Sequence, residues 1–262
     1  MVVKLVALSA VGCALVLALS GCSRSSAASS SYTLMQMNLC LSGLAGCYAK
    51  VQYPAVVDEA VARIRGAHPR AVTFNEACRS DVAGIARRTG YHLRFSTVIY
   101  RGERLRCVRP GGRGLFGDAV LTKAPIEGTD NEDFATQAGI ERRRWLCVAT
   151  RDGVDVCTAH LNTRSSTETA GNDAQCAELG TLLAGRATER AVIFGGDVNR
   201  RRSCARDGFW TRTDRSAGQA AGLQHVYASS GFSSPAAQVV TARHTDHDIL
   251  LVRAQLRGRS GS

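Results

Sequence analysis

The sequence predicts one α+β domain over residues 32–255. The chain of 262 residues has 45% apolar and 21% charged side chains, which suffices for a substantial core and excludes a disordered tail, a collagen-like repeat and a coiled coil. Segments with strand-like alternation are interspersed with amphipathic segments of helical period. No internal repeat and no second linker interrupts this order, so a single domain is expected.

The predicted elements follow one another with short connections. The first strand covers residues 32–39, and apolar positions at helical spacing predict a helix over residues 54–68, where the proline suits the first turn. A second helix is expected over residues 80–90, from a serine cap to a terminating glycine, and a third over residues 173–187. Further strands are predicted at 71–75, 91–99, 117–122, 144–150, 154–161, 191–194, 225–229 and 248–252.

The first residues have the pattern of an export signal. Lys4 precedes a 15-residue apolar run, which is shorter than the roughly 20 residues of a membrane span. Leu-Ser-Gly-Cys at 19–22 resembles the lipobox of bacterial lipoproteins, in which the cysteine is lipidated. We therefore expect a signal peptide at 1–21, a lipid anchor on Cys22 and a Ser-rich tether over 22–31, with a flexible tail at 256–262. Cleavage followed by free secretion is the alternative.

These features predict an exported, extracytoplasmic protein that contacts the membrane only through its lipid anchor. The formal net charge is +11, and it becomes +10 when residues 1–21 are removed, because Lys4 is their one charged residue. A strongly basic surface favours polyanions such as nucleic acid, phosphorylated small molecules or anionic membranes. The alternative is that the charge only keeps the protein soluble. A monomer is expected.

The eight cysteines of the domain indicate disulfides. Their number is even and no CxxC pair occurs, which favours disulfides over zinc in an exported protein. Cys147 and Cys157 flank an Arg-Asp-Gly turn and would face each other on adjacent strands. Cys40 and Cys47 would close a short loop, and some cysteines remaining as buried free thiols is the alternative. The favoured pairs are Cys40–Cys47, Cys78–Cys107, Cys147–Cys157 and Cys176–Cys204.

Polar residues with the chemistry of a metal or proton-transfer site end or follow five predicted strands. Each alone has an ordinary explanation, such as a solvated carboxylate, a structural histidine or an Asx turn. Together they offer the oxygen ligands that Mg²⁺ accepts, beside imidazoles able to act as acid or base. Two glycines before the first Asp are expected to permit a tight turn. The residues are Asn38, Glu76, His160, Asp197, Asn199, Asp246 and His247.

This ordered set resembles the endonuclease/exonuclease/phosphatase superfamily. The resemblance extends from Met35 to Val252. It implies a four-layer α/β/β/α sandwich, with two mostly antiparallel sheets face to face and helices outside, and metal-assisted phosphoester hydrolysis. The motifs are Gln-Met-Asn-Leu at 36–39, Phe-Asn-Glu at 74–76, Gly-Asp-Ala-Val-Leu at 117–121, Ala-Pro-Ile at 124–126, Thr-Ala-His-Leu at 158–161, Gly-Asp-Val-Asn at 196–199 and Thr-Asp-His at 245–247.

The resemblance also implies a role for each matching residue. Glu76 would bind the divalent metal with help from Asn38 and Asp246, with Mg²⁺ expected and Mn²⁺ or Ca²⁺ as alternatives. His247 would be the general base that activates water, although some family mechanisms give this work to the position of Asp197.

Two further matching residues would act on the phosphate. Asn199 would position the nucleophile or a phosphate oxygen. His160 would donate to the phosphate or protonate the leaving oxygen.

The chain departs from the superfamily pattern at one position. An Asp that orients the catalytic histidine usually precedes the closing Asp-His, whereas this chain has Gln224 or His225 there. A glutamine accepts a hydrogen bond without supplying a negative charge, which would weaken the base. The alternative is that Asp248 or Asp214 substitutes for the missing carboxylate.

The basic runs at 142–144 and 200–202 point to the substrate. Arg144 and Arg200 are the expected phosphate-binding residues, because a guanidinium suits bidentate recognition of phosphate; the alternative is a solvated charged run. Only 6% of residues are aromatic, which leaves little material for base stacking. A relatively nonspecific nuclease is therefore favoured. A phosphatase or sphingomyelinase-like phosphodiesterase, and a catalytically weak surface-binding lipoprotein, are the alternatives.

Overall fold

The computed structural model describes residues 1–2, 29–216 and 218–258. Residues 3–21 of the expected signal peptide, the anchor at Cys22 and most of the tether lie outside the described residues, as do the last four residues of the tail. None of the described helices is long and apolar enough to cross a membrane.

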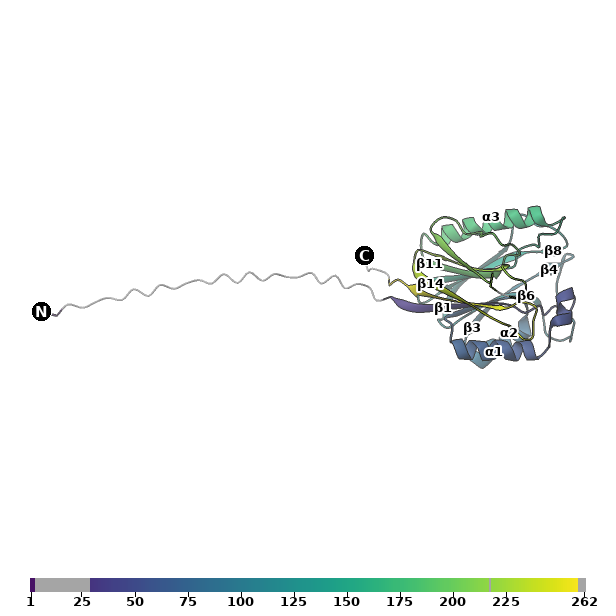
Figure 1. Ribbon diagram of the computed structural model, residues 1–262, viewed down its shortest axis with the longest axis horizontal. Coiled ribbons are helices and arrows are strands. Elements are labelled where there is room, and N and C mark those ends of the chain that lie inside the picture. Colours follow the sequence, from purple (N-terminus) through teal and green to yellow (C-terminus); the bar gives the residue numbers. More distant parts are fainter. Residues whose placement is uncertain (3–28, 217, 259–262) are drawn as a thin grey trace.

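Two six-stranded sheets lie face to face, with helices on their outer surfaces (Figure 1). The first sheet has the order β14 (Phe232–Val240), β15 (Ile249–Leu256), β1 (Ser30–Asn38), β2 (Ala71–Cys78), β6 (Phe116–Thr122), β3 (His92–Thr97). The second has the order β12 (Phe209–Thr213), β13 (Gln224–Ser229), β11 (Ala191–Asp197), β10 (Val154–Ala159), β9 (Arg144–Thr150), β7 (Ile126–Asp133). A small sheet contains β5 (Glu103–Arg104), β4 (Ile99–Tyr100) and β8 (Glu141–Arg142).

The helices complete a four-layer sandwich. Helices α1 (Ala55–Ala67) and α2 (Arg79–Thr89) pack on the first sheet, and α3 (Thr169–Arg186) packs on the second. A short 3₁₀ helix covers Gly46–Lys50. The expected α+β class and layer order are confirmed.

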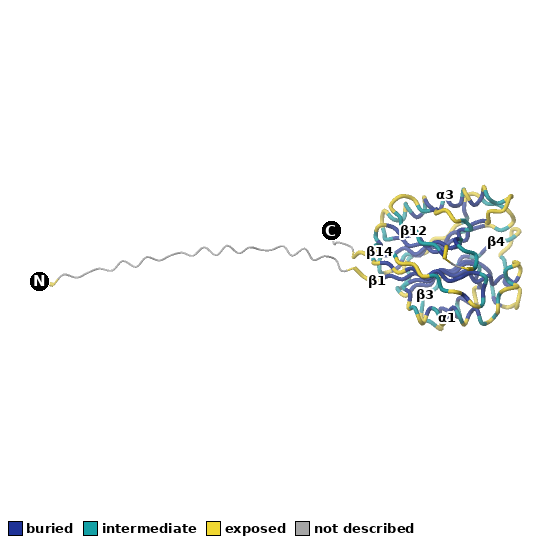
Figure 2. The backbone as a smooth tube through the Cα atoms, in the orientation of Figure 1, coloured by how far each residue is buried: buried dark blue, intermediate teal, exposed yellow. Residues whose placement is uncertain are grey.

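Three apolar clusters hold these layers together. The central cluster lies between the two sheets and contains residues such as Leu34, Leu146, Ile193 and Leu250. The other two lie between each sheet and its helices. Figure 2 shows the strands as the most deeply buried part of the molecule. Burial of this apolar area is the main force that holds the sheets together.

Each large sheet has one pair of parallel strands near its middle. β1 runs parallel to β2 and antiparallel to β15, while β10 runs parallel to β11 and antiparallel to β9. The carboxyl ends of these strands place Asn38, His160 and Asp197 at one edge of the sandwich, where an isolated parallel bridge joins the last two. This topology is what gathers residues that lie far apart in the sequence.

Five strands of the described chain were not predicted, namely the two-residue strands β5 and β8 and the longer strands β7, β12 and β14. All are edge strands, and their half-exposed sequences lack the apolar alternation that marks a buried strand. The predicted strand at 91–99 is two strands, β3 and β4, and α3 begins four residues before the predicted start at Asp173. Ser30 already pairs with Leu256, so the folded domain extends slightly beyond 32–255 at both ends.

The eight cysteines of the described residues form four disulfides, in the pairs that the sequence favours. Cys147 and Cys157 lie directly opposite each other on β9 and β10. The remaining bonds are Cys40–Cys47, Cys78–Cys107 and Cys176–Cys204.

The two glycines before Asp197 allow close packing rather than a turn, Gly195 against the facing sheet and Gly196 against the adjacent strand β10. Both lie within β11, and neither has a positive φ angle. A Cβ on Gly195 would lie 2.4 Å from Thr73 Oγ1, and one on Gly196 would lie 2.4 Å from the carbonyl oxygen of Ala159. The strand therefore needs glycine because its neighbours approach so closely.

Candidate active site

The predicted site residues converge on one pocket of about 510 Å³ at the edge where the central strands end. This volume is typical of a small-molecule site. Asn38 lies beside the pocket, hydrogen-bonded to two residues of its lining. Those predicted site residues that line it are Glu76, His160, Asp197, Asn199, Asp246 and His247.

Glu76 is directed into the pocket by a β-bulge. The pairing of β2 with β6 shifts register between Phe74 and Ala77, and Glu76 has a φ angle of +54°. The strand therefore continues past Glu76 instead of ending before it. Asn199, after β11, has a φ angle of +51°. Left-handed backbone at non-glycine residues is uncommon and concentrates at functional sites, where the surrounding structure enforces it.

Asn38 holds two carboxylates together. Its Nδ2 donates to Glu76 Oε1 at 3.0 Å and to Asp197 Oδ2 at 3.1 Å. Its Oδ1 accepts the backbone N–H of Cys40 at 3.1 Å, which fixes the orientation of the amide. The side chain thus presents its nitrogen to the carboxylates and positions them, while metal ligation by Asn38 stays a prediction.

The carboxylates suit a hard divalent cation. Glu76 and Asp197 share one amide donor, so their oxygens lie close together inside the protein. Burial raises the pKa of Glu76 to about 7, and the negative charge of Asp197 adds to this rise. A cation that neutralised this excess negative charge would favour the ionised acids. Glu76, Asp197 and Asp246 all present carboxylate oxygens to the pocket, and Glu76 and Asp246 remain the expected Mg²⁺ ligands.

His247 lies between two carboxylates. Its Nε2 is 3.2 Å from Asp197 Oδ2, and its Nδ1 is 2.9 Å from Asp246 Oδ1. Burial opposes a charge on the ring, but the two carboxylates outweigh this effect and raise the pKa of His247 to about 10. Burial likewise opposes ionisation of Asp197, yet the adjacent His247 keeps the pKa of that carboxyl well below its usual range. The pair is therefore held as imidazolium and carboxylate.

Arg143 determines the tautomer of His160 and, after burial, helps to keep its ring neutral. Its Nη1 lies 2.9 Å from His160 Nδ1, and a guanidinium can only donate, so Nδ1 accepts and the proton of the neutral ring is on Nε2. Burial, then the charge of Arg143, lowers the pKa of His160 to about 3. The Nε2–H faces the acids, 3.9 Å from Glu76 Oε1 and from Asp197 Oδ2. Asn199 Nδ2 lies 3.0 Å from Nε2 and donates to the carbonyl oxygen of Leu161 at 2.9 Å, which places Asn199 beside the ring.

The two arginines predicted to bind phosphate lie outside the pocket. Arg144 pairs with Asp133 at 2.9 Å, and Arg200 pairs with Asp173 at 2.8 Å beside a neighbouring hollow. The arginine of the pocket is Arg143, which sequence reasoning missed. The sequence did contain a signal for Arg143, because successive side chains of an extended strand point to opposite faces. Arg142 and Arg144 both reach Asp133, so the residue between them points the other way.

The departure at Gln224 leaves the carboxylate partners of His247 in place. Gln224 lies opposite Asp197 in the β11–β13 register, and its Nε2 donates to the carbonyl oxygen of Asp248. Neither proposed substitute serves His247. Asp214 accepts the backbone N–H groups of Gly222 and Gln224, and Asp248 accepts those of Ala242 and Gly218.

A buried polar network beneath the site was not predicted. Asn75 Oδ1 accepts from Gln36 Nε2 and from the backbone N–H of Asp197, each at 2.8 Å. Asn75 Nδ2 donates to Asp118 Oδ1 at 2.9 Å, and burial raises the pKa of Asp118 to about 7. These bonds tie the strand of Glu76 to the strand of Asp197 across the two sheets, which fixes the spacing of the carboxylates above them.

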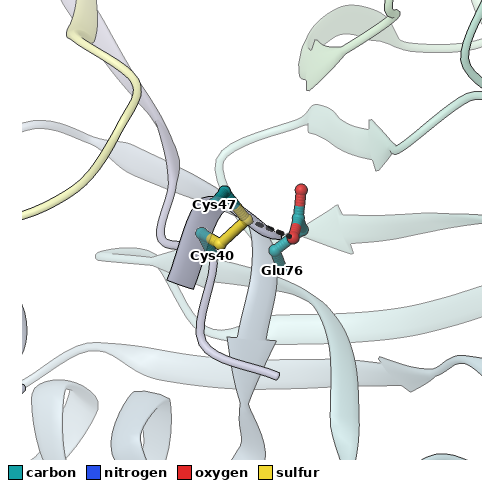
Figure 3. A group of neighbouring side chains, drawn as sticks. All are labelled: Cys40, Cys47 and Glu76. Atoms are coloured by element: carbon teal, nitrogen blue, oxygen red, sulfur yellow. Dashed lines mark hydrogen bonds between the residues drawn. A yellow bond between two sulfur atoms is a disulfide. The ribbon is translucent and has the colours of Figure 1, made fainter. Parts of the chain in front are cut away.

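A disulfide lies directly against Glu76 (Figure 3). The Sγ atom of Cys47, which is bonded to Cys40, lies 3.8 Å from Glu76 Oε2. A disulfide sulfur carries neither a proton nor a thiolate charge, so it is neither a donor nor a metal ligand. The bond instead constrains the segment between the two cysteines, and Ser42 and Leu44 in this segment form part of the pocket wall.

Comparison with known proteins shows the fold. No protein-family model and no curated protein matches the sequence. Similar solved structures include an endonuclease/exonuclease/phosphatase from Beutenbergia cavernae (TM-score 0.66, 18% identity, 87% of this chain and 72% of that chain). Truncated TDP2 from Caenorhabditis elegans is also similar (TM-score 0.63, 16% identity, 86% of this chain and 97% of that chain). So is the human Nocturnin catalytic domain with bound sulfate (TM-score 0.65, 12% identity, 86% of this chain and 93% of that chain). The chain therefore has the endonuclease/exonuclease/phosphatase fold.

Proposed function

We propose that this protein is a divalent-metal-dependent phosphoester hydrolase. The observation that carries the proposal is the convergence, in one pocket, of two imidazoles, a guanidinium and four carboxylates, of which Glu141 pairs with the guanidinium of Arg143. The carboxylates suit a hard cation, and the other groups suit an anionic phosphate. The fold shared with TDP2 and Nocturnin supports the same class of chemistry.

Each side chain has a defined task in this hydrolysis. When bound, the cation neutralises charge on the phosphoryl oxygens and orients the leaving group. Asn38 keeps Glu76 and Asp197 together. The neutral Nε2–H of His160 donates to a phosphate oxygen. Asp197 is held as a carboxylate and is oriented by His247, so Asp197 is the group of this pair that would accept the proton of the attacking water.

Among phosphoesters, we propose nucleic acid as the substrate and a relatively nonspecific nuclease as the activity. The net charge of +11 favours a polyanion. One similar structure is Danio rerio TDP2 complexed with single-strand DNA product (TM-score 0.60, 11% identity). The phosphatase alternative has support from ANGEL2, described as a 2',3'-cyclic phosphatase (0.62, 10% identity). The pocket volume is compatible with either.

A substrate panel tests this proposal. The purified protein is incubated with plasmid DNA, RNA, sphingomyelin and inositol phosphates, in Mg²⁺, Mn²⁺ or Ca²⁺ and then in EDTA. We expect metal-dependent cleavage of nucleic acid that Asp197→Asn reduces by at least about 10²-fold and that His92→Ala, an exposed histidine on β3, leaves unchanged. Phosphate release from small substrates alone would favour the phosphatase. A folded protein without activity on any substrate would overturn the proposal and favour the binding lipoprotein.

We also propose that the protein is an exported lipoprotein anchored through Cys22. The support is the signal-like start of the sequence, together with a domain whose eight cysteines are all in disulfides. Expression of the full chain in a bacterial host tests this. We expect the protein in the membrane fraction with an acylated N-terminal Cys22, and Cys22→Ser to abolish the acylation. Recovery of unmodified protein from the cytoplasm would contradict the proposal.

A further inference from the structure

A second hollow of about 580 Å³ lies next to the pocket. The two share Asn199 and Leu223 in their linings, so they are contiguous. The remaining lining of this hollow is four arginines and one acid, namely Arg164, Arg200, Arg201, Arg202 and Asp173.

The hollow carries an excess of positive charge. Asp173 is its single carboxylate, and both Arg164 and Arg200 pair with it. Arg201 and Arg202 are exposed, and neither forms an ion pair with a carboxylate in the described part of the chain. Four guanidiniums, two of them paired with Asp173 and two without a carboxylate partner in the described residues, thus face a single negative charge.

The backbone places this charge next to the catalytic groups. Asn199 connects the pocket to the hollow. Its backbone N–H donates to Asp197 Oδ1 at 2.9 Å, and its side-chain amide lies 3.0 Å from His160 Nε2. Its left-handed backbone, with φ of +51°, then redirects the chain so that residues 200–202 line the hollow. A strand whose scissile phosphate lay in the pocket would bring an adjacent phosphate to these arginines.

We propose that this arginine hollow, lined by Arg164, Arg200, Arg201 and Arg202, binds a phosphate adjacent to the scissile one, so that the substrate is a polynucleotide strand. The inference rests on the proposed function and deepens it. A substrate with a single phosphoester occupies only the pocket, whereas a polynucleotide presents phosphates at regular intervals along its backbone. No aromatic residue lines the hollow, so it recognises the backbone rather than the bases.

Binding without hydrolysis provides the first test. The fluorescence anisotropy of a labelled single-stranded oligonucleotide is measured in EDTA for the unmodified protein and for R201Q/R202Q. Loss of two phosphate contacts is expected to raise Kd about tenfold at 0.15 M salt and to flatten the slope of log Kd against log salt concentration by about 1.4. The control R65Q/R87Q removes the same charge from exposed positions on α1 and α2 and is expected to leave the slope within error of the unmodified protein.

A kinetic comparison provides the second test. Bis(p-nitrophenyl) phosphate has one phosphodiester and no neighbouring phosphate. We expect R201Q/R202Q to lower the ratio of kcat/KM for the oligonucleotide to that for this small diester about tenfold, mainly through KM, while the control keeps the ratio.

Several outcomes would overturn the inference. An equal effect of both double variants would show only an influence of net charge. Inositol hexakisphosphate that competed as well as an oligonucleotide of equal charge would contradict a polynucleotide strand. The anisotropy measurement needs no turnover. If the unmodified protein cleaves no substrate but R201Q/R202Q binds the oligonucleotide more weakly, the proposed hydrolase activity is refuted and phosphate binding in the arginine hollow is supported. If the protein cleaves nucleic acid but R201Q/R202Q binds as tightly as the unmodified protein, only phosphate binding in the hollow is refuted.

Discussion

Arg143 donates a hydrogen bond to Nδ1 of His160 across 2.9 Å, and this contact fixes which nitrogen of His160 faces the substrate. A second bond, from the same Nη1 to Glu141 Oε1 at 2.8 Å, holds the guanidinium in place. A histidine constrained in this way is a neutral hydrogen-bond donor, which favours the phosphate-binding role over protonation of the leaving oxygen.

Substitution of Arg143 tests this relationship. Arg143→Met removes the donor, so His160 should lose its single tautomer, and kcat on a cleavable substrate should fall by about 10²-fold, as expected when a reacting group is misplaced by about 1 Å. Arg143→Lys keeps a cationic donor and should recover part of the loss. The ¹⁵N shifts of the His160 ring report the tautomer independently of activity. Arg142→Met is the control, because Arg142 pairs with Asp133 outside the pocket. A protonated Nδ1 on His160 in the unmodified protein would contradict this interpretation.

Mg²⁺ should stabilise the protein through Glu76. At a concentration 100 times its Kd, a ligand that binds only the folded state adds about 2.7 kcal/mol to the free energy of unfolding, which corresponds to about 5–10 °C in Tm for a domain of this size. Scanning calorimetry with Mg²⁺ and with EDTA measures this shift. Glu76→Gln should abolish it, and Glu132→Gln, on the exposed edge strand β7, should keep it. A shift that survives Glu76→Gln would place the ion elsewhere.

Gly196→Ala should destabilise the fold. The added Cβ would lie 2.4 Å from the carbonyl oxygen of Ala159 and 2.6 Å from Cζ of Phe194, and such overpacking typically costs about 1–3 kcal/mol. Gly66→Ala is the matched comparison. A Cβ added to Gly66, on α1, would meet no atom within 4 Å, so alanine there should stabilise by about 0.5–1 kcal/mol through helix propensity. Urea unfolding measures both changes. An unchanged free energy of unfolding in Gly196→Ala would show that β11 can move away from β10.

His225 should make the protein less stable in mild acid. The ring is fully buried, with Nδ1 2.6 Å from the Tyr227 hydroxyl, and burial lowers its pKa to about 4. Below pH 6.5 the unfolded chain binds a proton that the folded state excludes. The free energy of unfolding therefore falls as the pH drops from 6.5 toward 4, by up to about 3 kcal/mol from this residue.

Urea unfolding at stepped pH values measures this loss. His160, whose pKa is also lowered, contributes to the unmodified protein and to the variant alike. His225→Gln keeps a donor near the carbonyl oxygen of Gly222, so it should remove only the part of the pH-dependent loss in the free energy of unfolding that His225 contributes. Curves for the two proteins that run parallel from pH 7 to pH 4 would show that His225 is protonated in the folded state.

The segments of this fold that could be predicted are those in which apolar residues mark the buried face. The central strands and all three helices carry apolar residues at the period of their element, and the cysteines of β9 and β10 flank a recognisable turn. The edge strands β7, β12 and β14 were missed because most of their residues are only partly buried or exposed, and such positions accept almost any side chain.

The sequence by itself determined the domain class, the core elements and the residue types that meet at the site, because these depend on local periodicity and on motifs. The tertiary structure alone decided how those groups are used. It turned the amide of Asn38 toward two carboxylates, selected Arg143 in place of Arg144, and set His247 between Asp197 and Asp246. Hydrogen-bond direction and protonation depend on distances of a few ångströms between residues far apart in the chain, and only packing of the two sheets fixes those distances.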